Sequence, residues 1–151
     1  MPLLAVWLAA SLAALCFAAT WTPLGPPNQQ LADWLSGHGY TEGLATYWQA
    51  DETTVTSDGK VLIPPVTSAA NSVRRWESSI DWYKPAHRNA NFVVAMTDPN
   101  FGALSPKTVR KAFGRPAHPY QVGDYVVMVY DSNLLTRLAN NVFPGVEPPN
   151  R

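Results

Sequence analysis

Two short segments of the chain place carboxylic acids beside large aromatic rings. Asp51 follows Trp48, and Asp81 lies between Trp76 and Trp82. The apolar faces of such rings stack on the C–H faces of sugars, while carboxylates accept hydrogen bonds from sugar hydroxyls. A pair of carboxylates flanking a glycosidic bond is also the arrangement used for acid–base chemistry on glycosides. These segments therefore predict a site that binds a sugar.

The residues expected to contact a ligand are Tyr47, Trp48, Asp51, Trp82 and Tyr83. The simpler alternative is that the rings are core residues or membrane-facing anchors and that the acids are solvated. Arg74 and Arg75 form a basic pair with the chemistry to bind phosphate or lipid head groups. An exposed pair with no ligand is the alternative there. The residues alone leave both questions open.

The sequence contains none of the motifs that would indicate a nucleotide-binding, nucleophilic, metal or nucleic-acid-binding site. It contains no phosphate-binding glycine loop, no G-x-S-x-G nucleophile motif and no H-E-x-x-H metal motif. The histidines, His38, His87 and His118, are far apart and are expected in loops, and Cys16 is the single cysteine. The 11 basic and 11 acidic side chains cancel, whereas nucleic-acid binding rewards clustered positive charge. We therefore expect no catalytic residue, metal, cofactor or nucleic-acid partner.

An uncharged apolar segment opens the chain. Residues 2–20 are mostly Leu and Ala, and no charged side chain precedes Asp33. A helix of that length spans about 28 Å, close to the hydrocarbon thickness of a bilayer. Residues 1–21 are therefore predicted to be a transmembrane helix or signal anchor, followed by a proline-rich linker over 22–27. A cleaved signal peptide and a buried core helix are the alternatives.

The segments that carry the candidate site residues have recognisable local patterns. Asn28 is expected to cap a helix that ends near Gly37, and residues 40–48 are expected to form a second short helical segment. The β-branched residues after Glu52 and the Asp-Gly pair at 58–59 predict an antiparallel hairpin over 53–63.

Four segments follow in the second half of the chain. Residues 73–83 are ambiguous between strand and helix, and residues 91–97 form an apolar run typical of a central strand. Residues 105–114 have the signals of a helix, with Ser105 as its cap. Residues 120–130 are predicted to form a second central strand, and residues 131–138 a short final helix.

These elements together predict one domain over residues 28–140, followed by a disordered tail over 141–151. Its class is α+β, or a small α/β arrangement, because strands and helices are interspersed. We expect a compact mixed sheet of about four strands with three or four short helices.

A family resemblance adds to these expectations. The residues that carry it are His38-Gly39, Gly43-Leu44-Ala45, Tyr47-Trp48, the strand pair predicted over 53–63 and the run 113–135. They resemble the C-terminal extracytoplasmic domains of bacterial multi-pass membrane proteins similar to GT-C-type glycosyltransferases, which include protein mannosyltransferases and aminoarabinose transferases. The family's catalytic loop lies in a membrane region that has no counterpart in this sequence, so the resemblance supplies no catalytic residue.

The function expected from the sequence is that of an accessory or substrate-binding domain in cell-envelope glycosyl transfer, held at the cell membrane by one helix with its soluble domain outside the cytoplasm. The expected partners are the membrane, a multi-pass membrane protein and a glycan or polyprenyl-linked sugar. Two alternatives remain. One is a purely structural module that packs on a membrane protein, and the other is a small hydrolase that uses Asp51 or Asp81.

Overall fold

The computed structural model describes residues 28–74, 78–99 and 102–138, together with three single residues nearer the N-terminus. The predicted membrane segment (1–21), most of the linker (22–27) and the predicted tail (141–151) therefore lie outside the described ranges. Within the described residues, no helix has the length and apolar character needed to cross a membrane. The predicted α+β class with a four-stranded mixed sheet is confirmed.

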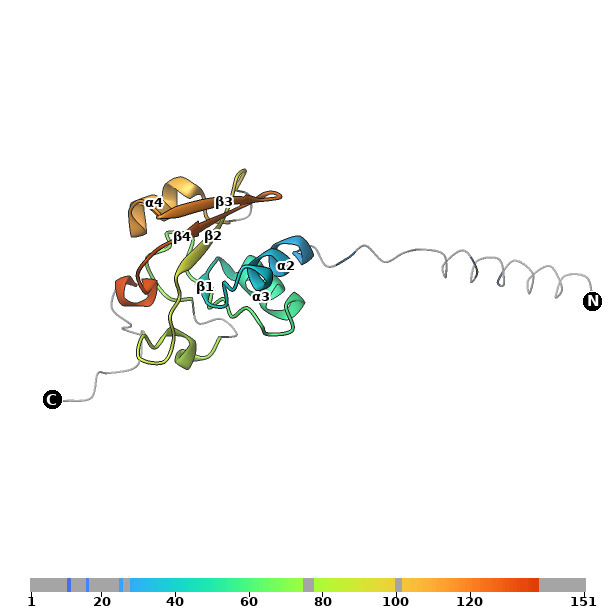
Figure 1. The fold of residues 1–151 in the computed structure, drawn as a ribbon, viewed down its shortest axis with the longest axis horizontal. Coiled ribbons are helices and arrows are strands. Elements are labelled where there is room, and N and C mark those ends of the chain that lie inside the picture. Colours follow the sequence, from blue (N-terminus) through green and yellow to red (C-terminus); the bar gives the residue numbers. More distant parts are fainter. Residues whose placement is uncertain are drawn as a thin grey trace, which may run out of the picture.

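The strands of this sheet are β1 (Gly43–Leu44), β2 (Phe92–Met96), β3 (His118–Val122) and β4 (Tyr125–Val129). The sheet is built around β4, which pairs antiparallel with β2 on one side and with β3 on the other (Figure 1). The order across the sheet is β1-β2-β4-β3, with β1 parallel to β2 and the other neighbours antiparallel. Strand β3 is therefore an edge strand.

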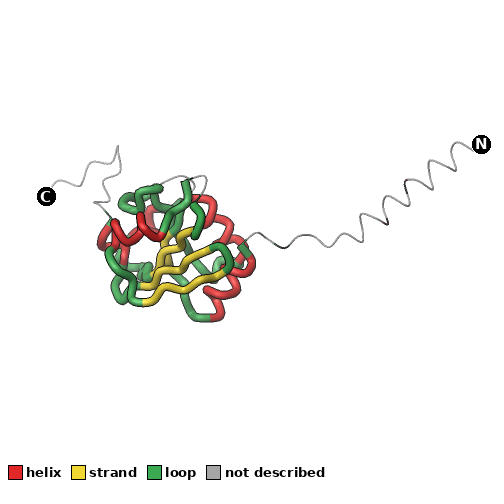
Figure 2. The backbone as a smooth tube through the Cα atoms, turned by 90° about the horizontal axis from the view of Figure 1, so that it is seen from above, coloured by secondary structure: helices red, strands yellow, loops and turns green. Residues whose placement is uncertain are grey.

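Helices cover both faces of this sheet (Figures 1 and 2). In the described ranges the α-helices are α2 (Gln29–Gly37), α3 (Tyr47–Thr56) and α4 (Pro106–Phe113), and the 3-10 helices are η1 (Ile80–Tyr83) and η2 (Leu134–Arg137). Successive residues of β2 point to opposite faces, as a strand requires. Phe92 and Val94 pack with residues of α2 and α3, whereas Val93 and Ala95 pack with residues of α4 and η2.

Two predicted elements are confirmed almost to their ends. The apolar run 91–97 contains β2, and all but its last residue are buried. Helix α4 begins as predicted, because the Ser105 hydroxyl accepts a hydrogen bond from Thr108 N at 3.0 Å and Pro106 occupies the first helical turn. It ends at Gly114, whose φ of 80° is a conformation that glycine adopts readily.

The start of α2 is confirmed, but the predicted role of Asn28 is wrong. Its side chain makes no cap hydrogen bond and is fully buried. The side-chain amide donates to Glu52 at 2.9 Å, and its oxygen accepts from the Tyr125 hydroxyl. Asn28 therefore ties α2 to α3 and β4, because a buried amide needs partners for both its donor and its acceptor.

The hairpin predicted over 53–63 is wrong. Residues 53–56 belong to α3, because Ala50 and Thr53 lie three positions apart on a buried helical side and tertiary packing outweighs β-branched propensity. The turn itself is present, with positive φ at Asp58 and Gly59. It leads from the helix into an extended segment that runs parallel to β1, through a bridge between Glu42 and Leu62.

Other boundaries also differ from the sequence prediction. Residues 40–48 do not form one helical segment, because β1 occupies their centre and α3 begins only at Tyr47. The strand predicted over 120–130 is a hairpin, because the chain reverses at Gly123, where φ is 56°. The ambiguous segment 73–83 ends in η1, capped by the Ser79 hydroxyl.

Thr53 provides a test of the α3 assignment. Its hydroxyl is buried and has no hydrogen-bond partner among the described residues. Because a buried unsatisfied polar group destabilises the fold, we expect Thr53→Val to raise the free energy of unfolding by about 1 kcal/mol in urea denaturation. The neighbouring Thr54 is the matched control, since its hydroxyl accepts from Ile63 N at 3.2 Å and Thr54→Val should be destabilising. Destabilisation by both variants would contradict the expectation.

Candidate functional site

Helix α3 brings together three of the residues predicted to bind a ligand. Trp48 is 61% exposed, and its ring meets that of Tyr47 edge to face with centroids 5.1 Å apart. Asp51 lies one helical turn after Trp48 and is half-buried. The helix therefore places a ring and a carboxylate one turn apart, and ligand binding by these residues stays a prediction.

The other two predicted residues lie in η1 and do not extend that surface. Trp82 is half-buried against the core, and Tyr83 is only 1% exposed. The Tyr83 hydroxyl donates to Pro65 O at 2.7 Å. Burial raises the pKa of Tyr83 to about 12, opposed by a hydrogen bond with Ser78 and assisted by the charge of Asp51. Tyr83 is thus placed in the core, where its ring is not accessible for stacking on a sugar.

Asp81, the second acid of the proposed hydrolase, is exposed and forms an ion pair with Lys84 at 2.5 Å. The hydrogen bond from Lys84, followed by its charge, lowers the pKa of Asp81. A general acid in glycoside hydrolysis needs the opposite shift, because it must hold its proton near neutral pH. The environment of Asp81 therefore favours the solvated-acid interpretation.

A larger group of aromatic rings within the described residues comes from side chains that the sequence did not single out as a site. It consists of Trp34, His38, Tyr40, His118 and Tyr120, which we call the ring cluster. The Trp34 ring stacks on His38 with centroids 4.2 Å apart and on Tyr40 at 5.6 Å. Across the gap between α2 and β3, Trp34 meets Tyr120 at 5.1 Å, and Tyr120 lies 6.3 Å from His118.

Local structure explains how each ring reaches this surface. Trp34 and His38 are four residues apart, on one face of α2 and its C-terminal cap. His118, Tyr120 and Val122 point to the same face of β3, and Val122 is buried in the core on the side where α2 packs. The Tyr40 ring meets the buried Phe92 ring in a T-shaped contact, with centroids 6.0 Å apart. The ring cluster is therefore anchored to the core.

The ring cluster carries polar atoms as well as apolar ring faces. His38 Nδ1 lies 2.8 Å from Trp34 O, and because a carbonyl only accepts, Nδ1 is the donor. A neutral His38 then presents Nε2 as an acceptor. Burial, a hydrogen bond with the Tyr120 side chain and the charge of Tyr120 raise the pKa of Tyr40, so the two tyrosine hydroxyls lie next to each other. Acceptors and donors thus border the stacked rings.

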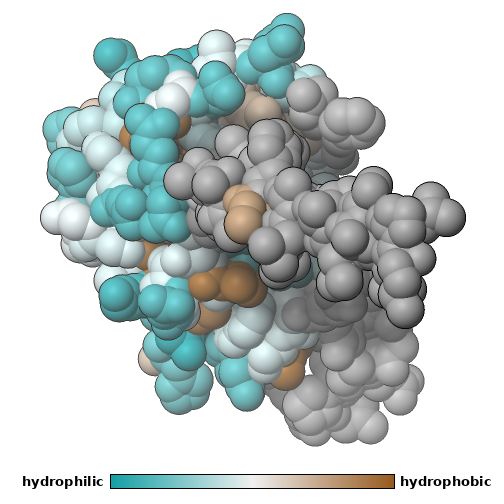
Figure 3. Space-filling model, turned by 90° about the vertical axis from the view of Figure 1, so that its right-hand side faces the viewer, coloured by the Kyte–Doolittle hydropathy of each residue, from teal (hydrophilic) through white to brown (hydrophobic). Residues whose placement is uncertain are grey.

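The ring cluster lies at the surface of the molecule. Tyr120 is 37% exposed, His38 and His118 are exposed, and the other two rings are half-buried. Seen from the end of the molecule on which α2 lies, the described surface is mainly hydrophilic with separate apolar spots (Figure 3). An exposed aromatic site in a polar surface suits a ligand that needs both stacking and hydrogen bonds.

The expectation that all three histidines lie in loops is wrong for His118, which is part of β3. His38 and His118, although far apart in sequence, join the same cluster. The spacing of Trp34 and His38 on a helix and of His118 and Tyr120 on a strand was the available sequence signal. It did not show that the two segments meet. Comparisons of the chain with family models, curated proteins and solved structures find no match.

Proposed function

We propose that this chain is an extracytoplasmic accessory domain, anchored to the cell membrane, that binds a glycan in cell-envelope glycosyl transfer. The observation that carries the proposal is the ring cluster, in which five rings from α2, β3 and the turn after α2 gather at an exposed surface. The apolar residues 2–20 support the anchor. The resemblance to the C-terminal domains of GT-C-type proteins supports the link to glycosyl transfer.

The chemistry of the ring cluster favours binding over catalysis. Flat rings offer apolar faces to a sugar, and the tyrosine hydroxyls and the free nitrogen of His38 offer hydrogen bonds to its hydroxyl groups. None of the five side chains is a carboxylic acid, whereas glycoside hydrolysis ordinarily uses two. The expected ligand is therefore held and oriented here, and a partner such as a multi-pass membrane protein performs the chemical step.

Calorimetric titration of the full chain in detergent tests the proposal. The ligands are soluble oligosaccharides of hexoses and of N-acetylhexosamines. We expect at least one of them to bind, and we expect Tyr120→Ala to weaken that binding at least tenfold, because it removes an exposed stacking ring without emptying the core. A tenfold loss corresponds to about 1.4 kcal/mol, within the range of one stacking contact.

Trp48→Ala is the matched control, because Trp48 is the most exposed aromatic side chain in the described part of the protein and lies outside the ring cluster. It should leave the affinity unchanged. If Trp48→Ala abolished binding and Tyr120→Ala did not, the glycan site would lie on α3. If no oligosaccharide bound the wild-type chain, the proposal would be contradicted. Packing of α3 on a partner, through the exposed Trp48 and Val55, would then account better for the exposed side chains.

A further inference from the structure

Charge is separated across the sheet. Residues 28–59 contain no Lys or Arg, and their acids are Asp33, Glu42, Asp51, Glu52 and Asp58. Residues 99–123 contain no acid, and their cations are Lys107, Arg110, Lys111 and Arg115. The first group belongs to the layer of α2 and α3, and the second to α4 and the turn after it, on the other face of the sheet. The α4 layer is therefore basic even though the whole chain is neutral.

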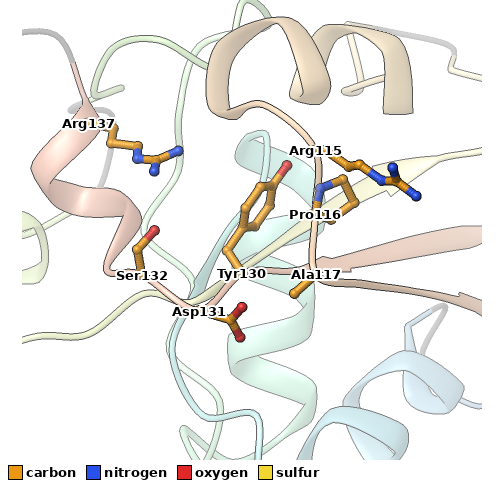
Figure 4. Close-up of a pocket in the computed structure, with 7 residues that line it drawn as sticks. All are labelled: Arg115, Pro116, Ala117, Tyr130, Asp131, Ser132 and Arg137. Carbon is orange, nitrogen blue, oxygen red and sulfur yellow. The ribbon is translucent and has the colours of Figure 1, made fainter.

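A pocket of about 370 Å³ opens at the C-terminal end of α4 (Figure 4). We call it the arginine pocket, and the lining residues that matter are Arg115, Tyr130, Asp131, Ser132 and Arg137. In Figure 4 the two arginines lie on opposite sides of the Tyr130 ring, and the Asp131 carboxylate points away from the Tyr130 hydroxyl. The guanidinium of Arg115 is turned outward in this view, and that of Arg137 lies on the side of the ring near η2.

The two arginines differ in how firmly they are held. Arg137 Nη1 donates to Phe113 O at 2.8 Å, and the Tyr130 hydroxyl donates to Gly114 O at 3.2 Å. These bonds satisfy carbonyls at the end of α4 and fix the Arg137 guanidinium at the pocket wall, with other N–H donors left over. Arg115 is exposed and makes no hydrogen bond or ion pair with any described residue, so it is free to turn toward a ligand.

A third arginine lies close by. Burial raises the pKa of Tyr130, and the positive charges of Arg110 and Arg137 oppose that rise. Both guanidinium groups are therefore within electrostatic reach of the Tyr130 hydroxyl. Among the described residues that line the pocket, Asp131 is the single acid against two arginines, so this lining carries an excess of positive charge.

We propose that the arginine pocket binds a small phosphate ester, with Arg115 and Arg137 gripping the phosphate oxygens and the Ser132 hydroxyl adding a neutral donor. Guanidinium groups match the geometry of phosphate oxygens and hold them with charge-assisted hydrogen bonds. The volume is within the range of small-molecule sites and exceeds what a bare phosphate ion fills, which leaves room for a polyol or one sugar ring. This site shares no residue with the ring cluster, although Ala117 of its lining directly precedes His118.

Calorimetric titration of the full chain in detergent at low salt tests this site. We expect glycerol 3-phosphate to bind and glycerol not to bind. Arg115→Gln should weaken the binding of glycerol 3-phosphate at least tenfold, because it removes a charge that supports no contact within the described fold. Arg137→Lys keeps the positive charge but removes the planar guanidinium group with its paired N–H donors, and it should also weaken binding. Lys107→Gln is the matched control, since it removes one charge from the first turn of α4, outside the pocket lining.

Two further ligands identify the source of the phosphate. Short-chain phosphatidylglycerol in the same detergent represents a lipid head group, and inorganic phosphate represents the free ion. Tighter binding of the lipid would identify a membrane phospholipid as the ligand. Tighter binding of glycerol 3-phosphate would identify a soluble ester. In either case, loss of that binding in Arg115→Gln would support the arginine pocket as the site. Inorganic phosphate binding as tightly as both esters would overturn the proposal of an ester. If Lys107→Gln and Arg115→Gln weakened binding equally, the binding would depend on the overall positive charge and the proposed pocket would be wrong. Failure of every phosphate compound to bind would also overturn the proposed site.

Discussion

Gly43→Ala is expected to lower the free energy of unfolding by about 1–3 kcal/mol, the usual range for overpacking a core. A Cβ atom at this position would lie only 2.2 Å from Phe92 Cε2, with two more ring atoms at 2.4 Å. Gly43 pairs directly with Phe92 in the parallel β1–β2 ladder and donates to Leu62 O at 3.2 Å on its other side. The backbone is held from both sides, so the buried ring must move.

Urea denaturation measures this effect, and two comparisons make it specific. Gly37→Ala is the matched control, because a Cβ at Gly37 meets nothing within 4 Å; it should be neutral or slightly stabilising at the end of α2. Phe92→Leu should relieve part of the clash, so the double variant should be more stable than the sum of the two single effects predicts. An unchanged stability of Gly43→Ala would refute the packing described for β1.

Elements whose signals are local could be predicted from the sequence. Ser105 and Pro106 open α4, Gly114 ends it, and the buried Val109 and Phe113 share one helical face. None of these signals needs a distant residue. Strand β2 was predictable for the same reason, because a strand covered on both faces is apolar at nearly every position.

Elements that depend on tertiary partners could not be predicted in this way. Residues 53–56 have strand propensity, but the segment is helical, with the buried side of α3 facing the core and the Thr54 hydroxyl accepting from Ile63 N. Strand β1 has only two residues, and its hydrogen bonds go to segments that lie far along the chain. Such elements are set by their neighbours in space.

The candidate site residues also fall into those that local sequence predicts and those that depend on tertiary contacts. Tyr47, Trp48 and Asp51 stay together because they are close in sequence and share one helix. The ring cluster requires α2 to pack beside β3, which no local pattern in either segment indicates. Tyr83 was predicted to contact a ligand but is buried. An aromatic residue beside an acid has the same sequence pattern whether its ring is exposed or buried.

The two proposed sites are expected to be independent of each other. The ring cluster packs on the core between the sheet and α2, whereas Tyr130 of the arginine pocket belongs to the core on the α4 face. The two sites adjoin along the chain, since Ala117 of the pocket precedes His118 of the ring cluster. Arg115, however, makes no hydrogen bond or ion pair with any described residue, and changes at side chains without shared partners are usually additive. Tyr120→Ala is therefore a control for phosphate binding, and Arg115→Gln is a control for glycan binding.

Tyr83 is expected to make the fold sensitive to alkaline pH. Its pKa is about 12 in the folded state, against about 10 in the unfolded chain. Below pH 10 the Tyr83 hydroxyl is protonated in both the folded and the unfolded state, so its full contribution to the free energy of unfolding is present. Above pH 10 the unfolded state loses its proton first, so the free energy of unfolding falls as the pH rises toward 12. A shift of this size corresponds to a loss on the order of 3 kcal/mol once the pH exceeds 12.

Tyr83→Phe isolates this contribution. At pH 8 the variant should be less stable than the wild type by about 1 kcal/mol, because it loses the hydrogen bond to Pro65 O, which keeps a second donor in Arg74 N at 3.0 Å. Between pH 10 and 11.5 the difference should shrink and then reverse, since the variant has no proton to lose at this position. Tyr125 and Tyr130, whose pKa values are also raised by burial, are present in both proteins and cancel in the comparison. Urea denaturation at a series of pH values gives the difference directly. If it stayed constant from pH 8 to 11.5, the Tyr83 hydroxyl would have to be accessible to water in the folded state, which would return Tyr83 to the list of residues able to meet a ligand.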